Sequence, residues 1–455
     1  MQVDKSIFKA YDIRGIYGTA LFEDTAEAVG KAFVKVIGAT NVIVGRDARV
    51  SSPALHARVI QGLTSVGANV IDLGMVSTDM YYYACATKDL PGIMITASHN
   101  PKEYNGFKMV RKIPYLLSGD EGIQDIRQII EADAFPPAAA TPGTVSQWDV
   151  MPEFIQKITT LVDLTAIKPM KVIADTANGM VGPTLDEFYK HLPQVKLTPM
   201  YFEPDGNFPN HGGDPLMPEN RAEIEQRVVA EGADLGFLFD PDGDRFFVID
   251  QKGRFIAGDF LTALLAEYFL NREPGSTIVY DIRSSYAVKD RVTQLGGRAL
   301  YNRVGHAYIK KRMMDENAIF GGEVTGHYYF RDFYFCDSGI APMIYLLDLL
   351  SKEARSLDQL VDDLTTMYHI SGEINTRGVD SAIVFQRIHD EYKGQAHEVL
   401  DVDGISMDFG DWHFNVRASN TEPLVRLNLE AKTYALMEQK REELLALIRE
   451  GLNKG

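Results

Sequence analysis

Residues 92–108 read G-I-M-I-T-A-S-H-N-P-K-E-Y-N-G-F-K, and this stretch predicts the fold around it. The apolar run from Ile93 to Ile95 ends in small and polar residues, which is typical of a buried strand that stops at a loop. Pro101 prevents simple continuation of the strand, because proline lacks the amide donor that a ladder needs. We therefore expect a short buried strand that delivers Ser98 to an exposed loop.

The side chains around Ser98 are those used in covalent catalysis. His99 and Asn100 lie directly beside the serine, and Lys108 follows within ten residues. A serine at a strand end with these neighbours is a candidate nucleophile or phosphate carrier. An ordinary polar turn capped by its own side chains explains the stretch equally well when it is taken alone.

Composition restricts the class of protein. A chain of 455 residues is too long for one ordinary core, so three or four domains are expected. The content of 45% hydrophobic and 24% charged residues is typical of a soluble globular protein. A formal net charge of -17 argues against a nucleic-acid binder, which needs a basic surface to neutralise phosphates. A small anionic ligand remains possible if a few basic side chains converge.

The cysteines and the N-terminal residues indicate a compartment. Cys85 and Cys336 are the only two cysteines, so neither a disulfide framework nor a cysteine-based zinc site is expected. The chain begins without an apolar segment of the signal-peptide type, and no apolar run approaches the length of a membrane span. These features favour a cytoplasmic protein that acts without a membrane.

The pattern of strands and helices repeats three times. Each unit reads β-α-β-α-β, and its third strand ends in a loop dense with functional side chains. Because ligands in open α/β sheets gather at the carboxyl ends of strands, the three loops could face one cleft. The expected strands are 41–45, 68–73 and 92–95, then 170–174, 195–201 and 235–239, then 277–280, 298–301 and 319–322.

Four domains follow from this pattern. The Pro- and Ala-rich segment 135–143 is the clearest linker, and the last part of the chain alternates short strands before a charged helix over 434–450. The fold class is α/β: three similar mixed-sheet domains and a C-terminal α+β domain. We expect their bounds at 1–147, 148–250, 251–368 and 369–455.

The second loop, D-P-D-G-D-R, is the most specific. Asp240, Asp242 and Asp244 alternate within one tight turn at a strand end, and three carboxylates so close together are unfavourable without a cation. All-oxygen ligation suits Mg²⁺. An EF-hand is a poor alternative, since Arg245 and Gln251 stand where that loop needs Gly and Glu. Aspartates that merely cap turns are the remaining alternative.

The third loop, G-G-E-V-T-G-H at 321–327, combines a carboxylate, a hydroxyl and an imidazole. In an extended segment Glu323 and Thr325 project to the same side, where they could bind adjacent hydroxyls of a sugar. His327 ends the loop, and His306 adds a second imidazole to the same unit. Taken singly, each of these residues is more often a plain surface group.

Two further stretches contain candidate anion ligands. In R-A-S-N-T, Arg417 brings a guanidinium, Ser419 and Thr421 bring hydroxyls, and the turn brings backbone amides, which together make an anion nest. No Walker A sequence accompanies it, so a nucleotide is not the obvious phosphate-containing ligand. Near the start, Tyr11 and Arg14 precede a glycine pair that could hold Arg14 toward a pocket, although a surface ion pair explains this arginine as well.

Taken together, the four loops strongly resemble the α-D-phosphohexomutase superfamily, and within it the bacterial phosphomannomutase/phosphoglucomutase group. The resemblance rests on T-A-S-H-N-P-K-E-Y-N-G-F-K, D-P-D-G-D-R, G-E-V-T-G-H and R-A-S-N-T-E-P, with K-A-Y-D-I-R-G near the start. It implies a heart-shaped enzyme of four domains with a central cleft. It also implies interconversion of hexose 6-phosphate and hexose 1-phosphate through a phosphoserine and a hexose 1,6-bisphosphate.

The resemblance also implies roles for individual residues. Ser98 would be the phosphoserine, and the three aspartates would hold Mg²⁺ together with an oxygen of its phosphate. His99, Lys108 and Arg245 would lie at the transferred group, and Glu323 and Thr325 would bind the sugar hydroxyls. The non-reacting phosphate would be held by Arg417, Ser419, Asn420 and Thr421, while Tyr11, Arg14, His306 and His327 match other cleft positions.

Two departures from the family pattern are visible. Arg283 stands where some relatives have lysine, and because arginine stays charged, a proton-transfer role there is doubtful. Thr325 replaces a common serine, which keeps the hydroxyl but narrows the sugar pocket.

Several readings stay open at this point. Mannose phosphates, and also glucose phosphates, are the expected substrates, with a monomer or weak homodimer as the acting species. A phosphoglucosamine mutase is one alternative. A phosphatase of the haloacid dehalogenase type, with Asp240 as its nucleophile, is another, and a sugar-phosphate sensor without activity is a third. We also expect the fourth domain to move when substrate binds.

Overall fold

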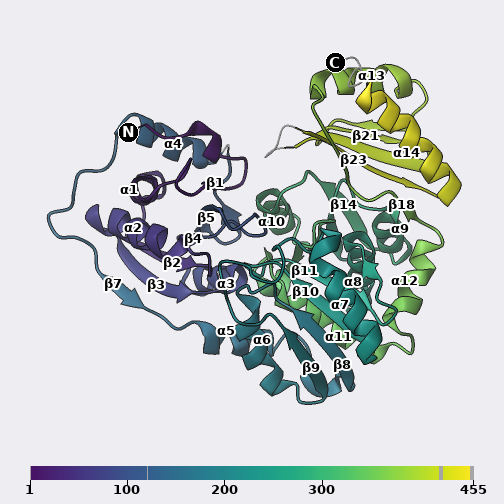
Figure 1. Cartoon of the computed structure of the whole chain (residues 1–455), viewed down its shortest axis with the longest axis horizontal. Helices are drawn as coiled ribbons and strands as arrows, with labels where there is room; N and C mark the ends of the chain where they lie inside the picture. Colours follow the sequence, from purple (N-terminus) through teal and green to yellow (C-terminus); the bar gives the residue numbers. More distant parts are fainter. Residues whose placement is uncertain (1, 120, 420–423, 451–455) are drawn as a thin grey trace.

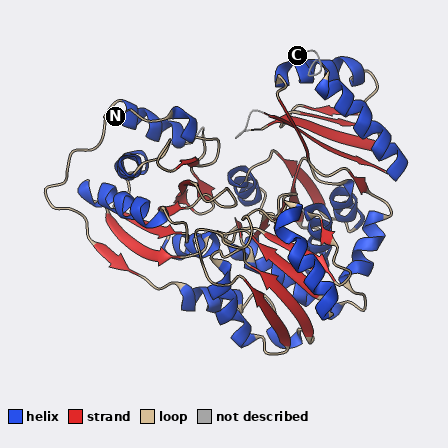
Figure 2. Cartoon of the chain, viewed as in Figure 1, coloured by secondary structure: helices blue, strands red, loops and turns tan. Residues whose placement is uncertain are grey.

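The computed structural model describes residues 2–119, 121–419 and 424–450, and within them four separate β-sheets, each covered by helices. Figure 1 shows the four sheets following one another along an arc, with the first and the fourth at its two ends. Figure 2 shows helices and strands mixed throughout the chain. Three α/β units followed by an α+β unit were predicted, and that fold class is confirmed. We call these units I to IV.

Unit I contains a seven-stranded mixed sheet. The strand order is β1-β5-β4-β2-β3-β7, with β6 paired to β5. Its elements are η1 (Lys5–Ile7), β1 (Ile13–Ile16), α1 (Glu23–Ile37), β2 (Asn41–Arg46), α2 (Ser52–Ser65), β3 (Asn69–Met75), α3 (Thr78–Lys88), β4 (Gly92–Ile95), β5 (Tyr104–Lys112), β6 (Tyr115–Leu116), α4 (Ile123–Glu131) and β7 (Val145–Gln147).

Unit II contains a five-stranded sheet of order β12-β11-β10-β8-β9. Its elements are α5 (Met151–Ile158), η2 (Leu164–Ala166), β8 (Met170–Asp175), α6 (Val181–Phe188), η3 (Tyr189–His191), β9 (Val195–Met200), α7 (Pro218–Glu231), β10 (Leu235–Phe239), β11 (Phe246–Asp250) and β12 (Phe255–Ile256). Because β12 pairs with β11, the second sheet continues past residue 250, where the sequence suggested that the unit ends. The boundary was placed too early because the short hairpin turn between β11 and β12 has the composition of a linker.

Unit III contains a five-stranded sheet of order β14-β13-β15-β16-β17. Its elements are α8 (Gly258–Arg272), β13 (Thr277–Asp281), α9 (Tyr286–Gln294), β14 (Arg298–Asn302), α10 (His306–Asp315), β15 (Phe320–Gly322), β16 (Tyr328–Phe330), η4 (Arg331–Phe333), β17 (Cys336–Asp337), α11 (Ile340–Lys352) and α12 (Leu357–Thr365).

Unit IV contains a six-stranded sheet of order β18-β23-β22-β21-β20, with β19 also paired to β23. All its strand pairs are antiparallel. Its elements are β18 (His369–Ile370), β19 (Ile374–Arg377), α13 (Ser381–Tyr392), β20 (Glu398–Leu400), β21 (Ile405–Asp408), β22 (Trp412–Ala418), β23 (Leu424–Ala431) and α14 (Tyr434–Arg449).

Units I to III share one strand topology. In each, the first strand of the repeat lies between the second and third, and all three are parallel. The next strand then runs antiparallel beside the third. The predicted chemical loop is the connection between these last two strands, so the same topology places a functional loop at the same point of all three sheets.

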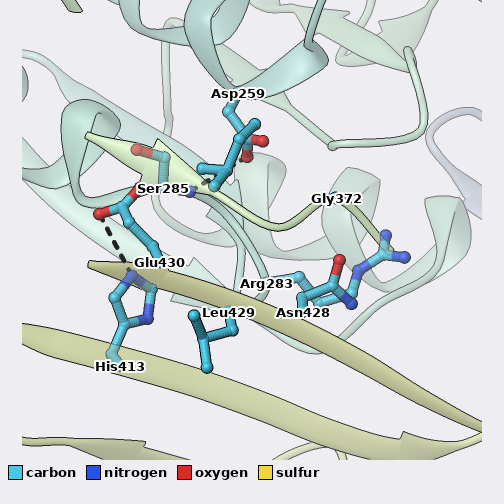
Figure 3. A pocket seen from close by; sticks show the side chains of 9 residues that line it. Asp259, Arg283, Ser285, Gly372, His413, Asn428, Leu429 and Glu430 are labelled. Atoms are coloured by element: carbon cyan, nitrogen blue, oxygen red, sulfur yellow. Dashed lines mark hydrogen bonds and ion pairs between the residues drawn. The ribbon is translucent and has the colours of Figure 1, made fainter. Parts of the chain in front are cut away.

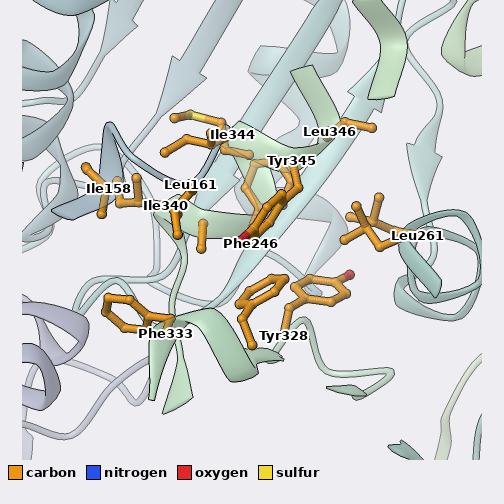
Figure 4. Packing of buried hydrophobic residues seen from close by; sticks show 14 of the residues in the cluster. Ile158, Leu161, Phe246, Leu261, Tyr328, Phe333, Ile340, Ile344, Tyr345 and Leu346 are labelled. Atoms are coloured by element: carbon orange, nitrogen blue, oxygen red, sulfur yellow. The ribbon is translucent and has the colours of Figure 1, made fainter. Parts of the chain in front are cut away.

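The hydrophobic cores show how the units are joined. One cluster of buried residues runs through units I, II and III and includes Tyr81, Phe154, Phe237 and Tyr345. Figure 4 shows part of it, with Ile158 and Phe246 of unit II packed among residues of unit III. Unit IV has a separate cluster. Burial of apolar area is the main stabilising contribution to a fold, so units I to III form one body. Unit IV reaches this shared core with the partly buried Ile370 of β18.

Candidate active site

Ser98 lies directly after β4 and points at the aspartate loop of unit II. Its Oγ donates a hydrogen bond to Asp240 Oδ2 at 2.7 Å and lies 3.2 Å from His99 Nδ1. The loop was expected to be exposed, but Ser98 is only 2% exposed. The physical reason is the packing of units I and II, which covers the end of β4 with the loop between β10 and β11.

The three aspartates converge as a buried cluster. Asp240, Asp242 and Asp244 have no exposed surface, and one carboxylate oxygen of each lies within 4.8 Å of the others. The ammonium of Lys108, on β5, lies 2.7 Å from Asp242 Oδ2 and also contacts Asp244. Thr78, the first residue of α3, donates to Asp242 Oδ2 at 2.7 Å. The cluster is therefore built jointly by units I and II.

The charged groups of this cluster shift one another's pKa values. Burial, together with Asp242 and Asp244, raises the pKa of Asp240. Burial also acts to raise the pKa of Asp242, but Lys108 outweighs it and holds that pKa below its usual range. The pKa of Lys108 is raised, because the aspartates outweigh its own burial. A cation is therefore strongly favoured among these carboxylates.

The donor set fits a divalent metal ion. Asp242 Oδ1 and Asp244 Oδ1 are buried and have no hydrogen-bond partner in the described structure. Buried acceptors without partners are costly, and a bound cation would satisfy them. Mg²⁺ prefers oxygen ligands, carboxylates among them, so these three residues are suited to hold it.

Arg245 connects the aspartate loop to unit III. Its Nε lies 3.7 Å from Asp240 Oδ2 and donates a hydrogen bond to His327 Nε2 at 3.1 Å. Nδ1 of His327 lies 3.0 Å from Asp337 Oδ2, and Asp337 pairs at 2.6 Å with the fully buried Lys310. This series of contacts through His327, Asp337 and Lys310 holds Arg245 beside Asp240, which is also the acceptor of Ser98.

His306 and Tyr11 extend this group toward the N-terminal segment. His306 begins α10, and its ring centroid lies 6.1 Å from that of His327 and 6.1 Å from that of Tyr11. Tyr11 donates a hydrogen bond to the carbonyl of Val304 at 3.0 Å. Burial and Lys310 lower the pKa of His306, which is therefore neutral at pH 7.

Arg14 lies on β1 and faces the serine loop. Its guanidinium pairs with Asp12, and it also donates to Asn100 Oδ1 two residues after Ser98. The ion pair raised from the sequence is present, and the position of Arg14 at a pocket stays a prediction.

Glu323 lies in a turn after β15 and not in an extended segment. The amide of Gly326 donates to the Glu323 carbonyl at 3.1 Å, which corrects the expectation that Glu323 and Thr325 project from one side of a strand. The buried hydroxyl of Tyr329 donates to the Glu323 carboxylate. Burial raises the pKa of Glu323. Thr325 is half-buried in the same turn.

A group of arginines lies where units III and IV meet. Arg283 pairs with Asp281 and lies 3.1 Å from Glu373 Oε2, while Arg417 lies 3.5 Å from the same oxygen. Arg426 pairs with Glu373 Oε1 and also lies 3.4 Å from the hydroxyl of Ser419, to which it donates. Asn420 and Thr421 lie outside the described residues. The three guanidiniums make this the more positive end of the candidate site.

A small cavity lined in part by Arg283 lies at the same junction, as Figure 3 shows. It measures about 20 Å³ and is lined by residues of both units, among them Asp259, Ser285, His413 and Glu430. Burial raises the pKa of Asp259 to about 7. The ring of His413 stacks on Tyr286 with centroids 3.8 Å apart. The junction of units III and IV is thus polar, in contrast to the apolar core of units I to III.

The structure thus arranges the predicted residues in two groups. The first surrounds Ser98 and contains the three aspartates, His99, Lys108, Arg245, Arg14 and His327. The second contains Arg283, Glu323, Arg417 and Ser419, and His306 with Tyr11 lie beside the first group.

Sequence reasoning missed several residues that contact the predicted ones. Thr78, Tyr329, Asp337 and Glu373 touch predicted residues but stand in stretches with no chemical motif. Asp337 carried a weak signal, as a charged residue after an apolar run. The other three become recognisable only once the units are packed together.

No helix in the described ranges is long and apolar enough to cross a membrane.

Comparison with protein families gives matches along most of the chain. Residues 5–137, 152–253 and 257–368 match domains I, II and III of the phosphoglucomutase/phosphomannomutase models, described as alpha/beta/alpha domains. Residues 373–447 match the C-terminal domain of the same set.

Similar proteins have been named. A phosphomannomutase of Escherichia coli strain K12 is 40% identical over 450 residues, which cover 97% of this chain and 99% of that protein. A protein of Xanthomonas campestris described as phosphohexose mutases is 40% identical over 444 residues, with 97% and 99% covered.

Solved structures share the fold. A phosphoglucomutase/phosphomannomutase family protein of Burkholderia thailandensis has a TM-score of 0.89 at 32% identity, covering 99% of both chains. Two structures of Aspergillus fumigatus N-acetylphosphoglucosamine mutase have TM-scores of 0.63 and 0.62 at 12% and 13% identity, covering 98–99% of this chain and 96% of theirs. One holds GlcNAc-6P and magnesium, and the other holds glucose 1,6-bisphosphate.

The order of the four loops, the repeated sheet topology and these matches over nearly the whole chain agree. The chain belongs to the phosphoglucomutase/phosphomannomutase family and is a hexose-phosphate mutase.

Proposed function

We propose that the enzyme interconverts hexose 6-phosphate and hexose 1-phosphate through a phosphoserine at Ser98 and a hexose 1,6-bisphosphate. The observation that carries the proposal is the contact of Ser98 Oγ with Asp240 Oδ2 at 2.7 Å, inside a cluster that also contains Lys108. Mannose phosphates, and also glucose phosphates, are the proposed substrates, because the 40% identical Escherichia coli relative is named phosphomannomutase.

Asp240, Asp242 and Asp244 would hold Mg²⁺. When bound there, the ion neutralises charge on the phosphoryl group, which is most of what phosphoryl transfer requires. A distant relative of the same fold was solved with magnesium, which supports this assignment.

The chain's own cations act on the same group. Lys108 lies among the aspartates, and Arg245 is held beside Asp240 by His327, so both can stabilise negative charge that develops between donor and acceptor oxygens. Burial, with Arg245 and Arg14, holds the pKa of His99 well below its usual range. His99 is therefore neutral and orients Ser98 by a hydrogen bond.

The substrate's other phosphate would bind at the arginine group. Arg417 and Ser419 lie there, and family resemblance adds Asn420 and Thr421. After the first transfer the bisphosphate must turn around, so that each phosphate in turn reaches Ser98. Glu323 and Thr325 would bind hydroxyls that both orientations present.

Movement of unit IV would permit this turn. Its hydrophobic cluster is separate from the one that joins units I to III, and its contacts with unit III include ion pairs, hydrogen bonds and the stacking of His413 on Tyr286. Polar junctions of this kind open at a smaller cost than an apolar core.

The test compares wild type with Ser98→Ala in coupled assays on mannose, glucose and glucosamine 1-phosphates. We expect the wild-type enzyme to turn over the mannose and glucose substrates. Chelation should abolish this activity, and added Mg²⁺ should restore it. In Ser98→Ala we expect kcat to fall by about 10⁴-fold or more, because the phosphate carrier is gone. Ser146→Ala, on the exposed strand β7, is the matched control and should behave as wild type. Full activity of Ser98→Ala would refute the proposal, and preference for the glucosamine substrate would correct the sugar.

A further inference from the structure

A second arginine in unit I is buried against the serine loop and has no part in the site described so far. Arg49 belongs to R-D-A-R-V-S-S-P, between β2 and α2, and its side chain is fully buried. It makes no contact with the aspartates or with Lys108 among the interactions of the described residues. A buried guanidinium is costly to desolvate, so it needs a full set of partners.

The partners of Arg49 are four backbone carbonyls of the serine loop. Nη2 donates to the carbonyls of Ser98 and Asn100, each at 2.6 Å, and Nη1 donates to those of Pro101 and Tyr104 at 2.8 and 3.0 Å. The guanidinium thus binds both sides of the loop that joins β4 to β5.

The serine loop needs such support. Ser98 has a φ of 50°, in the left-handed region that residues with a side chain rarely adopt. Conformations of this kind are unfavourable and persist only where the surroundings hold them. Here the held conformation is the one that directs Ser98 Oγ to Asp240.

Arg49 is itself held in place from two units. In unit I its Nε lies 3.2 Å from Asp47 Oδ2, and its amide donates to Asp47 Oδ1 at 3.0 Å. In unit II the ring of Phe208 lies over the guanidinium, 5.2 Å from its carbon. Gly206 packs so closely that an added Cβ would lie 2.3 to 2.6 Å from the backbone of residues 48–50.

We propose that Arg49 is a positioning residue for phosphoryl transfer, whose planar guanidinium holds the serine loop so that Ser98 faces the metal loop. The inference rests on the proposed role of Ser98 as the phosphate carrier. Lysine cannot replace this arginine, because an ammonium presents its three donors from one atom and cannot span four carbonyls.

The test is Arg49→Lys, which keeps the charge, assayed with mannose 1-phosphate and glucose 1,6-bisphosphate. We expect kcat to fall by about 100-fold, the effect of moving a reacting group by about 1 Å, while KM changes by less than about threefold. The folded fraction at the assay temperature is measured by circular dichroism. Arg58→Lys, which alters a half-buried arginine of α2 that pairs with Asp24 and Glu27 of α1, is the control and should leave kcat unchanged.

A second variant covers the case in which Arg49→Lys does not fold. Phe208→Ala removes the ring over the guanidinium from outside the catalytic groups, and we expect kcat to fall about 2- to 10-fold with KM little changed. Wild-type kcat in folded Arg49→Lys, or in Phe208→Ala if the lysine variant is unfolded, would overturn the inference. The inference would also be overturned if the loss of kcat equalled the fraction of unfolded protein, because the folded enzyme would then be fully active.

The two proposals fail separately. If Ser98→Ala is inactive but Arg49→Lys is fully active, the proposed phosphoserine is supported and the positioning role of Arg49 is refuted. If Ser98→Ala keeps full activity, the proposed phosphoserine is refuted, and the positioning role of Arg49 is refuted with it.

Discussion

Lys108 is the single residue on which the charge balance of the site depends most. It is the only ammonium that the described structure places against Asp242 and Asp244, and both carboxylates are buried. Replacing it by methionine keeps the apolar stem but leaves buried carboxylates unpaired, which costs several kcal/mol. We expect Lys108→Met to lower kcat by about 100-fold or more and to lower the unfolding free energy.

Lys112→Met is the matched control for this change. Lys112 lies on the same strand, but its side chain is 62% exposed and pairs with Asp89, so surface screening leaves the pair little energy. Steady-state kinetics and urea unfolding of the two variants separate the effects. A Lys108→Met enzyme with wild-type kcat would mean that the lysine serves neither the metal loop nor the transferred group.

At the same scale, the sequence predicted which residues lie close together better than it predicted their surroundings. Each motif residue in the described ranges lies near one of the two groups, because motif residues are adjacent in the chain. The burial of Ser98 and its left-handed φ could not be predicted, since both depend on the packing of unit II. The turn at Glu323 was missed because Gly326 was not recognised as its pivot, although its φ is 83°.

Among the elements, α8 and α9 lie at the junction of units III and IV. Asp259, in the first turn of α8, accepts a hydrogen bond from the amide of Ser285 at 3.0 Å beside the small cavity. Burial raises its pKa from 3.8 to about 7, so the folded protein binds its proton more tightly than the unfolded chain does. The stability from this group is therefore complete below about pH 4 and is lost as pH rises to about 7.

Asp259→Asn tests this dependence, because an amide resembles the neutral carboxyl at every pH. Relative to the variant, the wild-type unfolding free energy should fall by up to about 1.4 kcal/mol per pH unit across that window. Urea unfolding at pH 5, 6, 7 and 8 measures it. Asp24→Asn, at a side chain that is 77% exposed, should keep the wild-type slope. Equal slopes for wild type and Asp259→Asn would show that Asp259 is ionised throughout.

The elements themselves were largely predictable. Buried strands such as β4 and β10 are continuous apolar runs, so their ends could be placed within a residue or two. The shared strand order and the position of each chemical loop follow from the βαβ repeat. The hairpin that adds β12 to the second sheet was missed, because its turn residues are also those of a linker.

For the whole molecule, the central feature is a site assembled from several units. Residues of units I and II meet at Ser98, and Arg245 reaches into unit III. The number of units was predictable from the repeat, but the core that units I to III share was not, because apolar periodicity does not say which faces pack together. The shared core explains why the distance from Ser98 to Asp240 is well defined while unit IV is joined by polar contacts.

The most direct measurement is to locate the phosphate on the protein. Purified enzyme is incubated with glucose 1,6-bisphosphate and Mg²⁺, its intact mass is determined, and the modified peptide is sequenced by mass spectrometry. The account predicts one phosphoryl group, on Ser98, which is absent in Ser98→Ala and is lost when glucose 6-phosphate is added. A phosphate on Asp240, labile to hydroxylamine, or no phosphate on a protein that still turns over, would contradict it.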